Sequence, residues 1–201
     1  MRKMKTFIWI ILTILIIVAS LSGFNLKINA VYEQSITALE SGEYEEAIEG
    51  LKWVLKFRKN EEVKELFKVA KYEQETTPII EKFLKELVKA SHNIKTAKSI
   101  GDIEDNCKLL KKNFEEVDDL DENNNSELSI YLFFLKESRS YKSLKENVFN
   151  PNEIGRIDYP TSHSDLYRLP VAQSNIPETI EKILNQEQPN ALANRMKTLS
   201  R

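Results

Sequence analysis

The sequence predicts an all-α protein, in which an N-terminal transmembrane or signal helix precedes a helical bundle or short solenoid and an irregular C-terminal tail. Three observations predict this class. An uncharged apolar run opens the chain, apolar residues recur every three or four positions in its middle, and helix breakers are rare, with 5 Gly and 6 Pro among 201 residues. We expect residues 1–24 to form the signal anchor or signal peptide, residues 25–149 the bundle, and residues 150–201 the tail with one short helix.

The first segment combines a basic flank with an uncharged stretch. Arg2, Lys3 and Lys5 precede residues 6–24, which contain no charged residue. A helix of this length rises about 28 Å, close to the roughly 30 Å of a bilayer hydrocarbon core. Because basic flanks stay in the cytoplasm, a retained helix predicts a single-pass protein of the cell membrane whose C-terminal part is extracytoplasmic.

Removal of this segment as a signal peptide is the alternative interpretation. Residues 7–19, the most apolar stretch, have the length of a signal-peptide core. Ser20 and Ser22 provide small residues at the spacing that cleavage requires, and Ile28–Ala30 offers a poorer second site. The length and isoleucine content of the uncharged run favour the retained anchor.

Charge and cysteine content argue against several classes of function. The formal net charge is −2, and without the three N-terminal basic residues 26 basic residues face 31 acidic ones, about −5. Acids and bases alternate, so the chain lacks the basic field that nucleic-acid binding needs. Cys107, His92 and His163 are too few for an ordinary Cys/His zinc site. Cys107 lies on an apolar stripe with Ile103 and Leu110, so we expect it to be a buried packing residue. We expect no metal, no cofactor and no nucleic-acid partner.

Residues 31–75 contain a clear helical hairpin pattern. Gly42 can adopt the left-handed conformation that ends a helix, and the acids after it suit the N-terminus of the next helix. Ala47 is small enough to allow a neighbouring helix to approach closely. One apolar face follows at three- and four-residue spacing, formed by Tyr44, Ala47, Ile48, Leu51 and Leu55.

Together with Ala38 and Gly42, this face resembles the tetratricopeptide repeat, a helix–turn–helix unit of about 34 residues. The resemblance covers residues 31–75 and implies a hairpin followed by the first helix of a second unit at residues 61–75. The sequence departs from the repeat pattern at Ser35 in the first helix and at Lys59, where the repeat has its terminal proline.

Further helices are indicated by their termini. Thr77 and Pro78 predict a helix start, Gly101–Asp102 predicts the next, and Ser126 predicts a third. The run Leu132–Leu135 is apolar nearly all round, so we expect that third helix to be the central one. Residues 150–175 hold prolines and apolar residues, and we expect them to wrap the bundle or to dock on a partner.

No motif in the sequence specifies a reaction. Ser162–Asp165 places a serine, a histidine and an aspartate side by side, but a catalytic triad is assembled across a fold. Residues 119–127 lack the central glycine of a calcium loop. We therefore expect a membrane-tethered, outward-facing module without catalytic activity that binds an unidentified protein. The alternative is a secreted soluble helical effector or inhibitor, released by signal-peptide cleavage.

Three aromatic residues of the repeat-like region are candidate partner-binding residues, with core packing as their other role: Tyr44, Trp53 and Tyr72. They are candidates because aromatic side chains are enriched at protein interfaces.

The anchor predicts a definite fate for the N-terminus. In cells expressing a C-terminally tagged chain, we expect the product to stay in the membrane fraction with residue 1 intact. Protease added to intact cells or protoplasts should remove the tag. A soluble product in the medium that begins near Gly23 or Val31 would contradict retention, and a protected tag on a membrane-bound chain would contradict the orientation.

Overall fold

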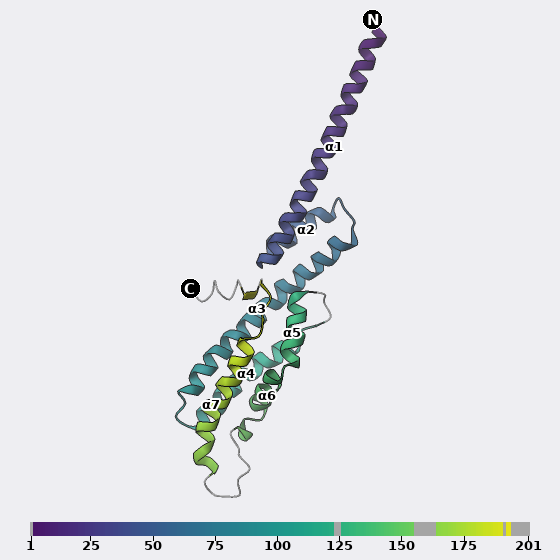
Figure 1. Cartoon of the computed structure of the whole chain (residues 1–201). Helices are drawn as coiled ribbons and strands as arrows, with labels where there is room; N and C mark the ends of the chain where they lie inside the picture. Colours follow the sequence, from purple (N-terminus) through teal and green to yellow (C-terminus); the bar gives the residue numbers. More distant parts are fainter. Residues whose placement is uncertain (1, 123–125, 155–163, 191, 194–201) are drawn as a thin grey trace. The chain divides into compact units, whose positions relative to one another are not determined.

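A computed structural model describes residues 2–122, 126–154, 164–190 and 192–193, while the side chains of residues 2–12, 14–19, 152 and 164–166 lie outside the description. Over the described residues the chain is helical and contains no strand, which confirms the all-α class. The elements are α1 (Arg2–Ser41), α2 (Tyr44–Leu55), α3 (Glu61–Lys95), α4 (Ile100–Asp118), α5 (Glu127–Glu137), α6 (Arg139–Phe149), η1 (Pro151–Glu153) and α7 (Ser164–Leu184) (Figure 1).

The chain divides into two compact units, Met1–Lys71 and Tyr72–Arg201, and each is described by itself. The first unit contains α1, α2 and the beginning of α3. The second contains the rest of α3 and the helices after it.

In the first unit α1 and α2 pack as a helical hairpin, and Gly42 and Glu43 lie between them (Figure 1). Gly42 has a φ of 79°, and its N–H donates to the Leu39 carbonyl at 3.0 Å, while the Glu43 N–H donates to the Ala38 carbonyl at 2.8 Å. The expected helix end at Gly42 is therefore confirmed. The resemblance to the tetratricopeptide repeat stays a prediction.

The two helices lie close together where Gly50 of α2 faces Ser35 of α1. A Cβ atom at Gly50 would lie 2.0 Å from the Ser35 Oγ atom and 3.3 Å from its Cβ. The Ser35 side chain is buried, and its hydroxyl donates to the Val31 carbonyl at 2.7 Å. The expected small residue Ala47 is fully buried too, and Gly50 is the position where an added Cβ atom would force the Ser35 hydroxyl to move.

The turn end of this hairpin is acidic. A hollow beside the turn is lined by Glu33, Gln34, Thr37, Ala38, Glu43 and Glu46. The first turn of α2 also carries Glu45, which is exposed. Acids at a helix N-terminus are favourable because they face the positive end of the helix dipole.

The core of the second unit is built on three aromatic rings from α3, α4 and α6. The ring centroids of Phe83 and Phe114 are 5.0 Å apart, those of Phe114 and Tyr141 are 5.0 Å apart, and those of Phe83 and Tyr141 are 5.9 Å apart. The Tyr141 hydroxyl donates to Asp118 Oδ1 at 2.9 Å, and Lys145 Nζ lies 2.6 Å from Asp118 Oδ2. The Phe83 and Phe114 rings thus pack edge-on, the Tyr141 ring is tilted against both, and the Tyr141 hydroxyl is hydrogen-bonded.

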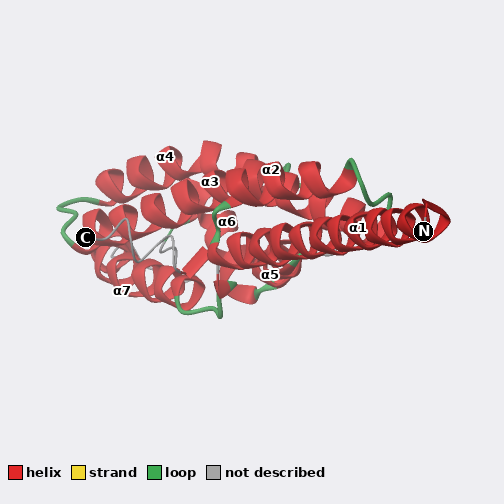
Figure 2. Cartoon of the chain, turned by 90° about the horizontal axis from the view of Figure 1, so that it is seen from above, coloured by secondary structure: helices red, strands yellow, loops and turns green. Residues whose placement is uncertain are grey.

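Helix α6 contacts three other helices of the second unit, α4, α5 and α7. Figure 2 shows helices joined by loops, with no strand, in the described part of the chain. Three of its residues, Tyr141, Leu144 and Val148, are buried on one face. Their three- and four-residue spacing is the reason α6 forms an amphipathic helix with a single inward stripe.

Two predicted loop or boundary regions are helical instead. Pro78 lies inside α3 rather than at its start, and Pro170 and Pro177 lie inside α7, which begins at Ser164. An internal proline costs a helix about 3 kcal/mol. Both helices bury apolar side chains around their prolines, such as Ile80 in α3 and Ile176 in α7, and this burial offsets the cost. Residues 155–163 of the expected tail lie outside the described residues.

The start of α4 also differs from expectation. Ser99, not the Gly101–Asp102 pair, is the N-cap. The Ser99 hydroxyl accepts from the Asp102 N–H at 3.2 Å, and the Asp102 carboxylate accepts from the Ser99 N–H at 2.9 Å. This is a capping box with aspartate in the position usually taken by glutamate.

The prediction of a membrane helix rests mostly on side chains outside the description. The α1 backbone is helical from Arg2 to Ser41, but the side chains of residues 2–12 and 14–19 are not described. Among the residues that are described, no helix is both long enough and apolar enough to cross a membrane. A span at residues 6–24 stays a prediction.

The close approach at Gly50 predicts that a large side chain at this position weakens the packing of α2 on α1. Gly50→Leu places a large side chain against Ser35, and such overpacking costs about 1–3 kcal/mol. Amide hydrogen exchange of residues 44–55 should accelerate about ten- to a hundredfold, while exchange of residues 103–117 in the second unit should not change. Glu49→Leu at the exposed neighbouring position is the control, and equal acceleration in both variants would contradict the packing.

Candidate functional site

One face of α5 exposes large apolar side chains. Ile130, Phe133 and Phe134 are 55%, 49% and 63% exposed, and the two phenylalanine rings pack with their centroids 5.6 Å apart. The opposite face is buried through Leu128, Tyr131, Leu132 and Leu135. The expectation that this helix is central is therefore wrong, because α5 buries only one of its two apolar faces.

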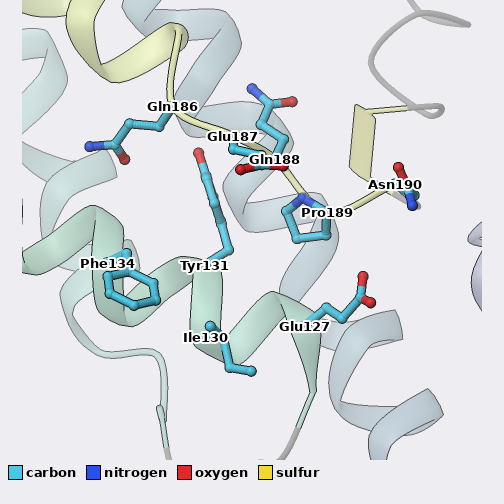
Figure 3. A pocket seen from close by; sticks show the side chains of 9 residues that line it. All are labelled: Glu127, Ile130, Tyr131, Phe134, Gln186, Glu187, Gln188, Pro189 and Asn190. Carbon is cyan, nitrogen blue, oxygen red and sulfur yellow. The ribbon is translucent and has the colours of Figure 1, made fainter.

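The exposed face of α5 borders a groove in the second unit (Figure 3). One wall is the segment that follows α7. The groove holds about 670 Å³, is open to solvent on one side, and has the size of known ligand-binding clefts. It is lined by Glu127, Ile130, Tyr131 and Phe134 of α5 and by Gln186, Glu187, Gln188, Pro189 and Asn190.

Two buried polar atoms in this groove have no hydrogen-bond partner among the described residues: the Tyr131 hydroxyl and Gln186 Oε1. Figure 3 shows the Tyr131 hydroxyl pointing toward the segment that contains Gln186. Tyr131 is 5% exposed, and burial raises the pKa of its phenol, so the hydroxyl is a neutral donor at physiological pH. A buried polar group without a partner costs about 1–3 kcal/mol, which a bound ligand with matching groups would recover.

A buried carboxyl group of α3 fixes the N-terminus of α5. Glu73 accepts hydrogen bonds from the Leu128 backbone N–H and the Ser126 hydroxyl, and it is 7% exposed. Ser126 is itself the N-cap of α5, since its Oγ accepts from the Ser129 N–H at 3.0 Å. The expected cap at Ser126 is confirmed, and it holds the groove wall against α3.

The environment of Glu73 raises its pKa to about 7. Burial is the main cause, and the nearby Glu127 carboxylate adds to it, while the hydrogen bonds from Leu128 and Ser126 act in the opposite direction. Glu73 therefore changes its charge near neutral pH.

The structure places the three sequence-predicted contact residues in different surroundings. Tyr44 is buried at the start of α2, while Trp53 lies near the end of the same helix and is partly exposed. The ring of Tyr72, in the second unit, is half-buried, and its hydroxyl donates to the Asp121 carbonyl. None of the three lines the groove on α5. A role for them in partner binding stays a prediction.

The described residues offer little for metal or nucleophilic chemistry. They contain no group of three His, Cys, Asp or Glu side chains placed to hold a metal ion. Cys107 is fully buried, and burial, with a smaller effect of the Glu104 charge, raises the pKa of its thiol to about 12. Cys107 is thus the buried packing residue that its apolar stripe predicted. His163 lies outside the described residues.

Sequence reasoning did not find Tyr131 and Gln186, because they are 55 positions apart in the sequence and meet only through packing of α5 beside the segment after α7. One local signal was available. The run Leu132–Leu135 has more apolar residues than one helix face can bury. Such an excess predicts either a central helix or an exposed apolar face, and the structure has the second.

Comparison with known proteins provides no family for the chain, because no protein-family profile matches it and no curated protein or solved structure is significantly similar to it.

The raised pKa of Glu73 predicts that the second unit is less stable at neutral pH than in mild acid. The folded carboxyl keeps its proton up to about pH 7, whereas the unfolded one releases it near 4.5. Between these values the folded state binds more protons, so the free energy of unfolding falls as pH rises, by about 3 kcal/mol in total.

Urea unfolding of the full chain in detergent, repeated at several pH values between about 4.5 and 7, measures how the free energy of unfolding changes with pH. Glu73→Gln should remove most of the slope, while Glu75→Gln at an exposed position of the same helix should keep it. Equal slopes in the two variants would contradict the assignment.

Proposed function

We propose that the protein is a membrane-tethered, outward-facing helical module that binds another protein and has no catalytic activity. The observation that carries the proposal is the exposed apolar face of α5 beside a groove with two unpaired polar atoms. Apolar anchors next to specific hydrogen-bonding groups are typical of protein interfaces.

The α5 face has the spacing of a partner-binding surface. Ile130, Phe133 and Phe134 stand three and four positions apart, so their side chains share one side of the helix. A contiguous exposed apolar patch on a folded domain favours association over solvation. Burying these three side chains in a partner would contribute several kcal/mol, at roughly 25 cal/mol for each Å² of apolar surface.

The groove beside this face suits an extended peptide segment. Tyr131 and Gln186 line the groove, and because their unpaired oxygen atoms are closed to solvent, a bound segment would pair with them only after neighbouring side chains move. Glu127 and Glu187 also line the groove, and none of the described residues that line it is basic. This charge favours a partner segment that is neutral or basic.

The tether is supported by the sequence of residues 1–24. The uncharged residues 6–24 follow three basic residues, which favours a retained helix with the later units outside the cell membrane. An anchor confines the binding surface to the membrane and so raises its effective concentration toward a partner held there. The absence of catalysis is proposed because the sequence contains no recognisable nucleophile, phosphate-binding or metal motif.

A secreted soluble effector or inhibitor is the second candidate function. The observation that favours it is the short apolar core at residues 7–19 followed by Ser20 and Ser22. The groove on α5 would serve both functions alike, so the state of the mature N-terminus decides between them.

Crosslinking from the groove tests the proposed function. A photoreactive amino acid at the exposed position Glu187 should form a specific adduct with one protein in intact cells. Phe134→Ala should weaken the adduct about thirtyfold, the effect of losing an interface anchor of about 2 kcal/mol. Because Phe134 is largely exposed, its truncation should leave folding unchanged.

Leu109→Ala is the matched control, since Leu109 is an apolar residue of α4 that is 72% exposed and does not line the groove. It should leave the adduct intact. Equal loss with both variants, or no adduct from position 187, would contradict the assignment of the groove.

A further inference from the structure

The register of the α1–α2 hairpin carries the end of α2 back toward the apolar run of α1. Gly50 lies against Ser35, and further along the pair Lys27 Nζ lies 5.8 Å from the centroid of the Trp53 ring. The ring centroids of Phe24 and Phe57 are then 5.0 Å apart, in an edge-to-face arrangement. Phe57 thus lies beside Phe24, the last residue of the uncharged run 6–24.

The chain at this point forms an aromatic and basic surface, which we name the α2–α3 corner. It consists of Lys52, Trp53, Lys56, Phe57, Arg58 and Lys59. No acidic residue occurs among residues 52–60. The three lysines are exposed, Phe57 is 48% exposed, and the Trp53 and Phe57 ring centroids are 5.0 Å apart.

Apolar side chains of α1 continue this surface. Leu21, Phe24 and Leu26 are 59%, 42% and 68% exposed. Since Phe24 contacts Phe57, the exposed apolar surface of α1 runs directly into the corner. Exposed apolar residues, a tryptophan and several lysines together are typical of protein segments that lie at the water–bilayer interface.

The positive charge of the corner favours anionic lipids. The hairpin is acidic at its turn, whereas residues 52–59 at its other end carry only basic charges and are followed by Glu61 and Glu62 at the start of α3. Basic residues beside a membrane are attracted to anionic headgroups, about fivefold in binding for each charge. Zwitterionic lipids give no such attraction.

We propose that the α2–α3 corner docks into the headgroup region of anionic lipids, at the bilayer surface from which α1 emerges. The inference rests on the membrane anchor of the proposed function, and it gives Trp53 a lipid contact in place of a protein partner. The protein then touches the membrane at two places, through the span and through the corner, and the hairpin between them is held by the Gly50 contact.

Tryptophan fluorescence of the full chain in vesicles tests the docking. Trp9→Phe leaves Trp53 as the only tryptophan, and Trp53→Phe leaves Trp9 as a reporter of the span. In vesicles of equal parts phosphatidylcholine and phosphatidylglycerol, lipids brominated near the headgroup should quench Trp53, and its emission should shift to the blue. In vesicles of phosphatidylcholine alone, both effects should weaken.

Neutralising the lysines of the corner provides the charge test. In the Trp9→Phe background, the triple variant Lys52→Gln, Lys56→Gln and Lys59→Gln should remove the difference between the two vesicle compositions. The matched control is Lys85→Gln, Lys89→Gln and Lys108→Gln, three exposed lysines of the second unit that change the net charge equally. This control should keep the difference.

The two reporters separate the possible failures. Quenching of Trp9 without quenching of Trp53 would overturn the docked corner and leave the anchor intact. Loss of quenching at Trp9 would overturn the anchor, and the corner with it. Quenching of Trp53 that is equal in the two vesicle compositions would overturn the assignment to anionic lipid.

Discussion

The absence of a side chain at Gly50 is the constraint on which the first unit depends. Because Gly50 has no Cβ, α2 can lie directly on Ser35 of α1. That contact fixes the register of the hairpin, and the register brings Trp53 to Lys27 and Phe57 to Phe24. A bulkier residue would move α2 outward, and the aromatic and basic corner would lose its position beside the end of the apolar run.

The second unit depends on a different kind of contact. Its aromatic cluster joins α3, α4 and α6, while α5 packs one apolar face on the core and is capped at its N-terminus by Glu73 and Ser126. A helix fixed in this way can leave one side uncovered. The exposed Phe134 and the groove beside it follow from this mode of attachment.

Local signals in the sequence predicted the local features of the fold. The turn at Gly42 follows from backbone freedom, the cap at Ser126 from a hydroxyl facing free amides, and the burial of Cys107 from its place on an apolar stripe. Features set by distant contacts were not predictable in this way. Pro78 stays inside α3 because burial around it outweighs a local preference, and the groove exists only because residue 186 returns to α5.

The acidic turn end of the hairpin affects how the hairpin is oriented at an anionic membrane. Ser41 stands 18 residues beyond Gly23 on one continuous helix, a rise of about 27 Å. The hairpin is thus an elongated electric dipole, with its positive pole at the corner and its negative pole at Glu43 and Glu46. An anionic surface draws in one pole and repels the other, so the field of the bilayer would itself keep the hairpin upright.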